Sequence, residues 1–346
     1  AMAMSGKPDL LICDEPTTAL DVQVQKSILI LLKELQQETG MGILFITHDL
    51  NVVASFADVV TVLYKGEVVE ENSTKAIFEN PTHPYTKALL ACRPGLYPKG
   101  YKLPVVQDFL SNSNYKVPPT PNNVTPLETT CNDTLLEVNN LTIRFPIATN
   151  FFGKVTKSFT AVDHISFDIK EGETLGLVGQ SGCGKTTLGR SIVGLQTINE
   201  GSIIYKGETI ATPNKPYNPN YKKIIQLIFQ DPYSSLHPRM RIGDAIAEPL
   251  LVHQIVKNKL ERKERVIEML EKVELPADCY NKYPHEFSGG QRQRIVIARA
   301  LIMQPKFVIC DESVSALDVS VQAQVLNLLN ELKASMQFSA LFITHD

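Results

Sequence analysis

From Leu135 to the end of the chain, short apolar runs alternate with longer segments in which apolar residues recur at helical spacing. The segment LLEVNNLTIRF, which begins at Leu135, alternates apolar and polar positions as a half-buried strand does. The pattern predicts strands at 136–145, 160–169, 174–178, 223–229 and 307–310, a last strand that ends at Ile343, and helices at 185–193, 257–275, 319–334 and from Ser288. Strands that alternate with helices predict an α/β fold with a largely parallel sheet.

Two parts of the chain repeat one another. Residues 10–21 read LLICDEPTTALD and residues 307–318 read FVICDESVSALD, which aligns Asp14 with Asp311 at an offset of 297 residues (311 minus 14). The sextet LFITHD occurs at 44–49 and again at 341–346, with the same offset. A constant offset at two places predicts a duplicated domain. Because the first copy begins just before Asp14 and the second stops at residue 346, we expect a partial tandem duplication that is truncated at both ends.

Residues 94–134 separate the two copies and are rich in proline and asparagine, without helical or strand periodicity. Such a composition predicts a linker. We therefore expect three parts: residues 1–93 as the C-terminal part of a first domain, residues 94–134 as the linker, and residues 135–346 as a second domain.

The composition predicts a folded chain and does not favour a nucleic-acid partner. Hydrophobic residues make up 43% and charged residues 21%, close to the averages of globular proteins. The formal net charge is -3, so the chain lacks the excess of basic residues that is typical of proteins that bind nucleic acid or an anionic membrane. No apolar run approaches the roughly 18 residues that cross a bilayer, and residues 1–7 lack the pattern of a secretory signal. The six cysteines have neither zinc-site nor disulfide spacing, which favours a reducing, cytoplasmic setting.

A glycine-rich segment lies between a predicted strand and a predicted helix, and its pattern G-x-x-x-x-G-K-T is typical of a phosphate-binding loop. Glycines let the backbone curl so that its amides point at phosphate oxygens. Lys185 is expected to reach the terminal phosphates and Thr186 to ligate Mg²⁺, whereas an ordinary glycine-rich turn is the alternative. The predicted nucleotide-binding residues of this segment are Gly179, Gln180, Ser181, Gly182, Cys183, Gly184, Lys185, Thr186 and Thr187.

Two acids follow the apolar run that begins at Phe307, at the edge of the sheet where parallel strands place their ligands. Asp311 is a candidate magnesium ligand, and Glu312 is a candidate for polarising the water that attacks the terminal phosphate. The alternative is that the two acids only cap the following turn. Their repetition as Asp14 and Glu15 favours the functional interpretation.

Residues 287–299, FSGGQRQRIVIAR, place a serine and two glycines before an amphipathic basic helix. This arrangement predicts a second helix start that can bind an anion. From spacing alone, a simple capped helix explains the segment equally well.

Taken together, these segments resemble the nucleotide-binding domains of ATP-binding cassette proteins. The resemblance implies a P-loop NTPase fold with a mostly parallel sheet, an antiparallel β subdomain and a helical signature subdomain, and it implies ATP and Mg²⁺ as ligands. The signature corresponds to Ser288, Gly289, Gly290 and Gln291, with Phe287 where leucine is usual. In this family the signature of one domain closes over ATP held by the other, so a second nucleotide-binding domain is required, here in cis in a full-length parent.

The resemblance also assigns roles to single residues. Gln230 would sense the terminal phosphate, contribute to the magnesium site with Thr186 and Asp311, and couple to the membrane partner. His345 would be the switch histidine beside the catalytic Glu312, and Glu15 and His48 would be their counterparts in the first copy. Asp21 and Asp318 fall in the loop that contacts the opposite domain, and Phe145 resembles the aromatic residue that stacks on adenine. A core phenylalanine at the end of a strand remains the alternative for Phe145.

Two stretches resemble oligopeptide and dipeptide importers in particular: NPTHPYTKALL at 80–90 and DPYSSLHPRM at 231–240. The resemblance implies an ATPase at the inner face of the cell membrane, working with permease subunits and a solute-binding protein and not with nucleic acid. Nickel or glutathione would be served by similar ATPases. The alternative is a soluble paired-cassette ATPase that acts on ribosomes or DNA. Ser313 stands where proline is usual, and no cysteine cluster for an iron–sulfur centre is expected.

Overall fold

The computed structural model describes residues 3–17, 20, 22–112, 115, 117, 133–149, 155–315 and 317–344. The chain forms two compact units, which consist of residues 1–126 with 316–327 and of residues 127–315 with 328–346. Asp21 and His345, discussed above, lie outside the described residues, as does Cys131, one of the six cysteines.

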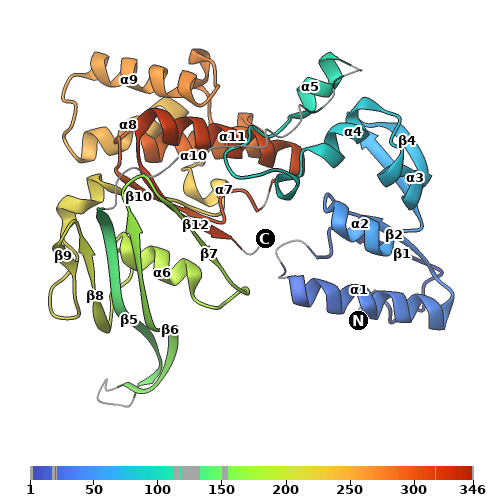
Figure 1. The fold of residues 1–346 in the computed structure, drawn as a ribbon, viewed down its shortest axis with the longest axis horizontal. Helices are drawn as coiled ribbons and strands as arrows, with labels where there is room; N and C mark the ends of the chain where they lie inside the picture. Colours follow the sequence, from blue (N-terminus) through green and yellow to red (C-terminus); the bar gives the residue numbers. More distant parts are fainter. Residues whose placement is uncertain are drawn as a thin grey trace. The chain divides into compact units, whose positions relative to one another are not determined.

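The first unit contains a parallel strand pair and an antiparallel hairpin (Figure 1). Its elements are β1 (Leu10–Asp14), α1 (Val22–Thr39), β2 (Gly42–Ile46), α2 (Leu50–Phe56), β3 (Val59–Tyr64), β4 (Glu67–Ser73), α3 (Thr74–Glu79), α4 (Pro84–Ala91), the 3-10 turn η1 (Pro94–Leu96) and α5 (Val106–Ser111). Lys65 and Gly66 form the two-residue turn between β3 and β4, and both have the positive φ that such tight hairpins require.

A carboxylate joins the hairpin to the start of α4. The Glu70 side chain accepts hydrogen bonds from the backbone N–H groups of Thr82 (2.8 Å) and His83 (3.0 Å) and from the Thr82 hydroxyl (2.8 Å). His83 in turn caps α4 through its Nδ1, and Pro84 occupies the first turn, where its missing N–H costs nothing. Burial alone would raise the pKa of Glu70, but the hydrogen bonds outweigh it and lower the pKa to about 2.

The described start of the predicted linker contains short helical elements. Residues 94–112 contain η1 and α5, and the side chains of Leu103, Val106 and Phe109 are buried against Ala88 of α4 and Cys92 directly after it. Because α5 is only six residues long, its apolar positions are too few to show a helical period in the sequence.

The second unit contains two four-stranded sheets (Figure 1). Strands β10, β11, β12 and β7 form a parallel sheet in that order, and β6, β5, β8 and β9 form an antiparallel one. The elements are β5 (Thr134–Thr149), β6 (Val155–Lys170), β7 (Thr174–Val178), α6 (Lys185–Ile192), β8 (Glu200–Tyr205), β9 (Glu208–Ala211), η2 (Pro219–Lys223), β10 (Ile225–Ile228), α7 (Pro232–Ser235), α8 (Ile242–Val252), α9 (Lys259–Lys272), η3 (Ala277–Asn281), η4 (Pro284–Glu286), α10 (Gly289–Leu301), β11 (Phe307–Asp311) and β12 (Ser339–Thr344). Helix α11 (Val319–Met336) begins in the first unit, which includes its residues up to Asn327, and continues in the second.

Helix α6 packs closely on the parallel sheet. Leu188 and Ile192 of this helix share a hydrophobic core with Ile309 and Ile343 of β11 and β12. At Gly189 an added Cβ would lie 3.0 Å from the Ile343 side chain, so a glycine lets the helix approach the sheet. This close packing fixes the start of α6 relative to the ends of the strands.

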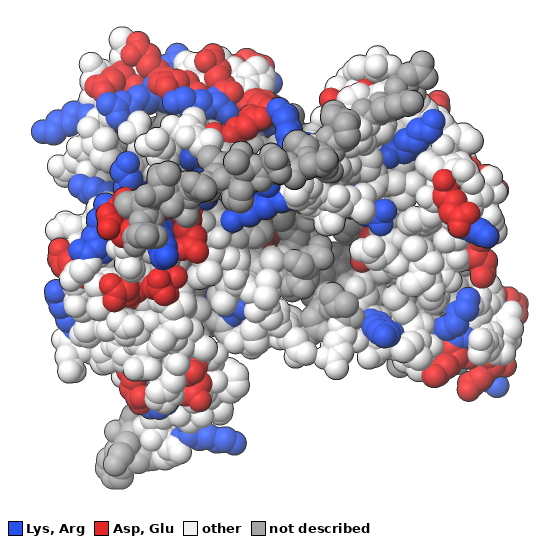
Figure 2. All heavy atoms as spheres, in the orientation of Figure 1, with Lys and Arg blue, Asp and Glu red and all other residues white. Residues whose placement is uncertain are grey.

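Helices α8, α9 and α10 pack on one another in the second unit, and α10 also contacts β10 of the parallel sheet (Figure 1). Figure 2 shows acidic and basic side chains interleaved over α9, where Arg265 pairs with Glu261 and Lys272 with Glu268. Such i, i+4 pairs indicate a solvated helix face and not a basic surface for nucleic acid. The fold is therefore the expected one, with a parallel sheet, an antiparallel part and a helical part.

The strand pairs β1–β2 and β11–β12 have the same register. Leu10 pairs with Gly42, and Phe307 pairs with Ser339. Adding the offset of 297 residues to the first pair gives the second pair. Within the described residues, every helix is too short or too polar to cross a bilayer.

Replacing Glu70 by glutamine is expected to destabilise the first unit by about 1–2 kcal/mol, because two backbone N–H groups lose a charged acceptor. Since the folded-state pKa lies below that of the unfolded chain, the stability due to Glu70 is present above about pH 4.5 and is lost as the pH falls toward 2. Urea unfolding followed at pH 7 and pH 3 measures both effects. Replacement of Glu67, an exposed acid on the same strand, is the control, and equal losses in the two variants would contradict the assignment.

Candidate active site

The four strands of the parallel sheet bring the predicted residues to one edge. In a parallel sheet the carboxyl ends of the strands meet at the same side, where ligands bind. Strand β7 leads to the glycine-rich loop, β10 leads to Gln230, and β11 ends at Asp311 with Glu312 directly after it. Strand β12 leads to His345, which is outside the described residues.

The glycine-rich loop can be built only with glycine at its critical positions. Gly182 and Gly184 have φ values of 77° and 97°, in the left-handed region that other residues avoid. An added Cβ at Gly184 would lie 2.2 Å from the carbonyl oxygen of Ala161, and one at Gly179 would lie 2.8 Å from the sulfur of Cys183. The loop thus forms a tight cradle ahead of the first turn of α6, as an anion site requires.

Lys185, the first residue of α6, turns its ammonium group back into this loop. Its Nζ donates hydrogen bonds to the carbonyl oxygens of Gly179 (2.7 Å) and Gln180 (2.9 Å), and it lies 4.0 Å from Oε1 of Glu312. The side chain is 6% exposed. A buried ammonium held by two neutral carbonyls is available for a stronger, anionic acceptor.

Thr186 links the loop to β11. Its hydroxyl donates a hydrogen bond of 3.0 Å to Oδ1 of Asp311, whose side chain is buried. Burial raises the pKa of the Asp311 carboxyl, and the hydrogen bond from Thr186 together with the charges of Arg190 and Lys185 opposes this only in part. A hydroxyl and a carboxylate oxygen so placed match the hard oxygen donors that Mg²⁺ prefers.

Glu312 stands in a constrained backbone position. Its φ is 46°, its N–H donates to the carbonyl oxygen of Ile343 (3.0 Å), and its Oε2 accepts a hydrogen bond of 2.7 Å from the side-chain amide of Gln230. Positive φ at a residue other than glycine is strained, and such residues concentrate at functional sites. The carboxylate therefore lies between the amide of Gln230 and the ammonium of Lys185, at the edge of the sheet.

The first unit repeats this arrangement in part. Glu15 has a φ of 45° and its N–H donates to the carbonyl oxygen of Ile46 at 3.0 Å, as Glu312 does to Ile343. Nδ1 of His48 lies 2.9 Å from Oε1 of Glu15. The structure thus brings the two predicted residues of the first copy together.

Residues Ser288 to Gln291 form the start of α10. The Ser288 hydroxyl accepts from the Gln291 N–H (3.4 Å), and the Gln291 side chain accepts from the Ser288 N–H (3.1 Å), which is a reciprocal capping box. In the described part of the chain these two side-chain hydrogen bonds join Ser288 and Gln291 to one another and do not involve the glycine-rich loop.

Comparison with known proteins identifies the architecture. Residues 162–315 match the family model described as "ABC transporter", and residues 69–112 match the one described as "Oligopeptide/dipeptide transporter, C-terminal region". The chain belongs to the ATP-binding cassette (ABC) transporter family.

Curated relatives include the "Glutathione import ATP-binding protein GsiA" of Pectobacterium atrosepticum, 47% identical over 348 residues, and that of Escherichia coli K12, 47% identical over 353 residues. Each alignment includes 100% of this chain and 55% of the relative, so the chain spans about half the length of these ABC proteins.

Solved ABC structures share the fold. The dimeric cassette MJ0796 in a post-hydrolysis state with ADP and Pi aligns at a TM-score of 0.53 with 26% identity, over 61% of this chain and 88% of that one. The cassette cbiO1 of Clostridium perfringens aligns at 0.51 with 25% identity, over 62% and 79%.

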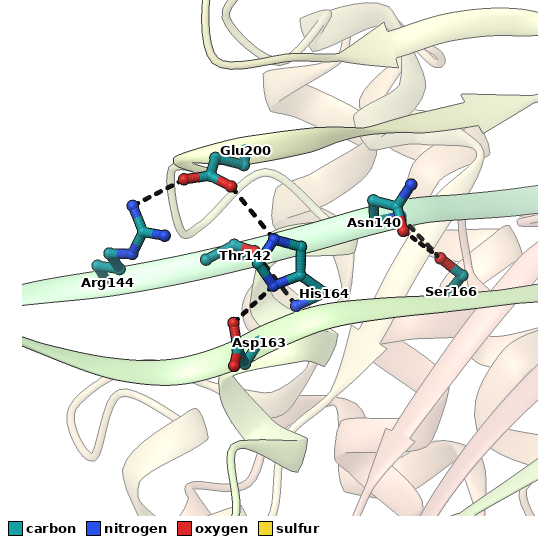
Figure 3. A network of polar contacts seen from close by, with 7 residues as sticks. All are labelled: Asn140, Thr142, Arg144, Asp163, His164, Ser166 and Glu200. Atoms are coloured by element: carbon teal, nitrogen blue, oxygen red, sulfur yellow. Dashed lines mark hydrogen bonds and ion pairs between the residues drawn. The ribbon is translucent and has the colours of Figure 1, made fainter.

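Within the ABC cassette of the second unit, Phe145 lies on β5 opposite Phe159 of β6, half-buried against the core. Beside it, Figure 3 shows Glu200 between Arg144 and His164, with Arg144 Nη1 2.7 Å and His164 Nε2 3.5 Å from the carboxylate. The Arg144 N–H also donates to the side chain of Asn199 (2.6 Å), which ties β5 down next to Phe145. Both interpretations of Phe145, adenine contact and core residue, fit this position.

Sequence reasoning did not predict three residues near this ABC site. Arg190 acts on Asp311 through its charge, the carbonyl of Ala161 limits position 184, and Phe159 presents an exposed ring opposite Phe145. Arg190 lies one helical turn after Thr186, and this spacing could have predicted that both face the same site. The other two depend on pairing between strands far apart in sequence.

Replacing Gly184 by alanine is expected to destabilise the second unit by about 3 kcal/mol or more, because the backbone strain adds to a collision with a carbonyl oxygen. At Gly182 the same change meets no atom within 4 Å, so its cost should stay near 1 kcal/mol. Thermal unfolding of both variants compares them directly. A Gly184 variant no less stable than the Gly182 variant would contradict this geometry.

Proposed function

We propose that this chain is an ATP-binding and ATP-hydrolysing part of an ABC importer, and that it carries portions of two cassettes. The observation that supports this best is the meeting of Lys185, Thr186, Gln230, Asp311 and Glu312 at one edge of the parallel sheet. A phosphate cradle, a pair of hard oxygen ligands and a constrained carboxylate are the parts that phosphoryl transfer to water needs.

In this mechanism the loop amides and Lys185 bind the β- and γ-phosphates, with Lys185 exchanging its two carbonyl acceptors for phosphate oxygens. Thr186 and Asp311 would hold Mg²⁺, and Gln230 would contribute to the same magnesium site. When bound, the ion neutralises charge on the phosphates. Glu312 accepts a hydrogen bond from the attacking water and orients it toward the γ-phosphate. The amide of Gln230 holds the carboxylate in place until nucleotide arrives.

Matching geometry supports the two-cassette proposal. The two strand pairs share one register, and Glu15 and Glu312 share the same left-handed backbone and the same hydrogen bond to the neighbouring strand. Each acid would then serve one of two shared sites, the first with His48 and the second with His345. Ser288 to Gln291 would complete one site from the opposite side.

The match of residues 69–112 to the oligopeptide/dipeptide transporter region supports a peptide cargo. The names of the curated relatives give glutathione, which is itself a small peptide, so we propose small peptides of this kind as the cargo. The same match favours transport over action on ribosomes or DNA.

A pocket of about 300 Å³ suits the permease partner that we propose. Gln226 and Phe229 line it from the β10 segment, and Val252 of α8, 67% exposed, lies at its wall. The next residue after Phe229 is Gln230, whose amide bonds Glu312. A permease segment bound in this pocket at the cytoplasmic face of the membrane would contact Phe229. Movement of Phe229 would shift the adjacent Gln230, and with it the hydrogen bond to the carboxylate of Glu312.

Replacing Lys185 by alanine is expected to weaken binding of a nonhydrolysable Mg-ATP analogue by tenfold or more, since a charge-assisted contact is worth roughly 1.5–3 kcal/mol. Fluorescence titration of this chain measures the affinity. Replacing Lys206, which pairs with Glu171 away from the loop, controls for the loss of a surface charge. Equal affinities in wild type and the Lys185 variant would refute the nucleotide site.

Replacing Val252 by glutamate is expected to abolish capture of the permease subunits by the full-length protein, because an unpaired charge would enter an apolar contact. Replacing Leu260 of α9, which is similarly exposed at 64%, is the matched control. Copurification from detergent extracts gives the readout. Retained capture with Val252→Glu would exclude this pocket as the permease contact.

A further inference from the structure

A buried cluster in the first unit contains residues from two distant parts of the chain. We name it the extension cluster: Ala88, Cys92, Leu103, Val106, Phe109 and Ala323. The first five lie in residues 84–112, which we call the extension, and Ala323 lies on α11. Val319 and Leu326 of α11 pack against the same cluster, so one face of the first turns of α11 is covered by the extension.

Asn327 adds a specific polar contact to this apolar interface. Its side chain accepts a hydrogen bond from the Leu103 N–H (2.9 Å) and donates one to the Leu103 carbonyl (2.8 Å), and both residues are buried. The amide thus satisfies both backbone groups of one residue, as a neighbouring strand would. An apolar side chain at this position would leave a buried donor and a buried acceptor without partners, which is costly.

The sequence repeat explains why α11, and not α1, is the partner. With the offset of 297 residues, Ala323 aligns with Lys26 and Asn327 aligns with Ile30. A lysine in place of Ala323, which is fully buried, would bring a charge into the extension cluster, and an isoleucine in place of Asn327 could not pair with Leu103. In α1 both Lys26 and Ile30 are exposed. Ala323 and Asn327 are among the positions at which the two helices differ, and both contact the extension.

The start of α11 lies close to the extension as well. Asp318 accepts hydrogen bonds from the N–H groups of Ser320 (3.1 Å) and Val321 (3.0 Å) and so caps the helix. Burial first, and then the charge of Asp318, raises the pKa of Tyr85, which belongs to α4. Asp318 is the residue that the family resemblance assigns to the loop contacting the opposite cassette.

We propose that the extension is a docking surface for α11 of the second cassette, with the Asn327–Leu103 pair setting the register and Ala323 giving the close fit. The assignment of α11 to a second cassette rests on the proposed function. If it holds, the docking is a noncovalent link between the two cassettes, in addition to the peptide chain that joins them. The docked helix presents Asp318 from a fixed helix start. The extension therefore positions the start of α11, which the family resemblance assigns to the loop between the cassettes.

Hydrogen exchange of this chain without nucleotide tests the docking. Asn327→Ile is expected to speed exchange at least about tenfold in residues 100–112 and 319–327, because the opened pair leaves two buried backbone groups without partners. Exchange in α10 should stay unchanged. The matched control is Asn330→Ile, which alters an exposed asparagine on the same helix and should leave both segments protected. Equal protection in the two variants would overturn the proposal.

Ala323→Lys gives a second, independent test, since it places the residue of α1 at the same position of α11. It is expected to release the same two segments, and retained protection would contradict the close fit. If Asn327→Ile does not fold, Asn327→Asp takes its place, because the carboxylate can accept from Leu103 but cannot donate to it. Binding of the Mg-ATP analogue by the wild-type chain is measured separately, so the docking and the nucleotide site can fail independently.

Discussion

The hydrogen bond between Thr186 and Asp311 joins the glycine-rich loop to the strand that carries the acids, and the rest of the site depends on that junction. Parallel pairing of β7, β12, β11 and β10 brings their carboxyl ends to one edge. Close packing of α6 on the sheet at Gly189 then fixes the positions of Lys185 and Thr186 relative to Asp311. The positions of the chemical groups thus follow from the sheet and from one tightly packed helix.

This arrangement concentrates groups that are unfavourable on their own. A buried ammonium, a buried carboxyl with a raised pKa and a glutamate in the left-handed region lie around one small volume. Each costs free energy in the folded state, and the surrounding sheet and helix offset that cost. A ligand that carries phosphate and a divalent ion would relieve several of these at once, so we expect the site to bind its ligand more strongly than a relaxed loop would.

Much of the second unit could be predicted from its sequence, because long periodic segments and a loop motif with fixed spacing are local signals. The helices at 185–193, 257–275 and 319–334 were predicted close to their observed bounds, and Lys185, Thr186, Asp311 and Glu312 meet as expected. The strand β9 and the helix α5 carried too few residues to show a period, and β8, which reads EGSIIY, does not alternate apolar and polar positions. The contact of Ala161 with Gly184 and the pairing of Asn327 with Leu103 depend on residues far apart in the chain, which no local pattern encodes.

A crystal structure of this chain with Mg²⁺ and a nonhydrolysable ATP analogue tests the central claim most directly. Triphosphate density enclosed by residues 179–186, with Lys185 moved from the carbonyl oxygens of Gly179 and Gln180 onto phosphate and Mg²⁺ beside Thr186 and Asp311, is the result we predict. Analogue density elsewhere, with the loop unchanged and Lys185 still on its two carbonyls, would contradict the account.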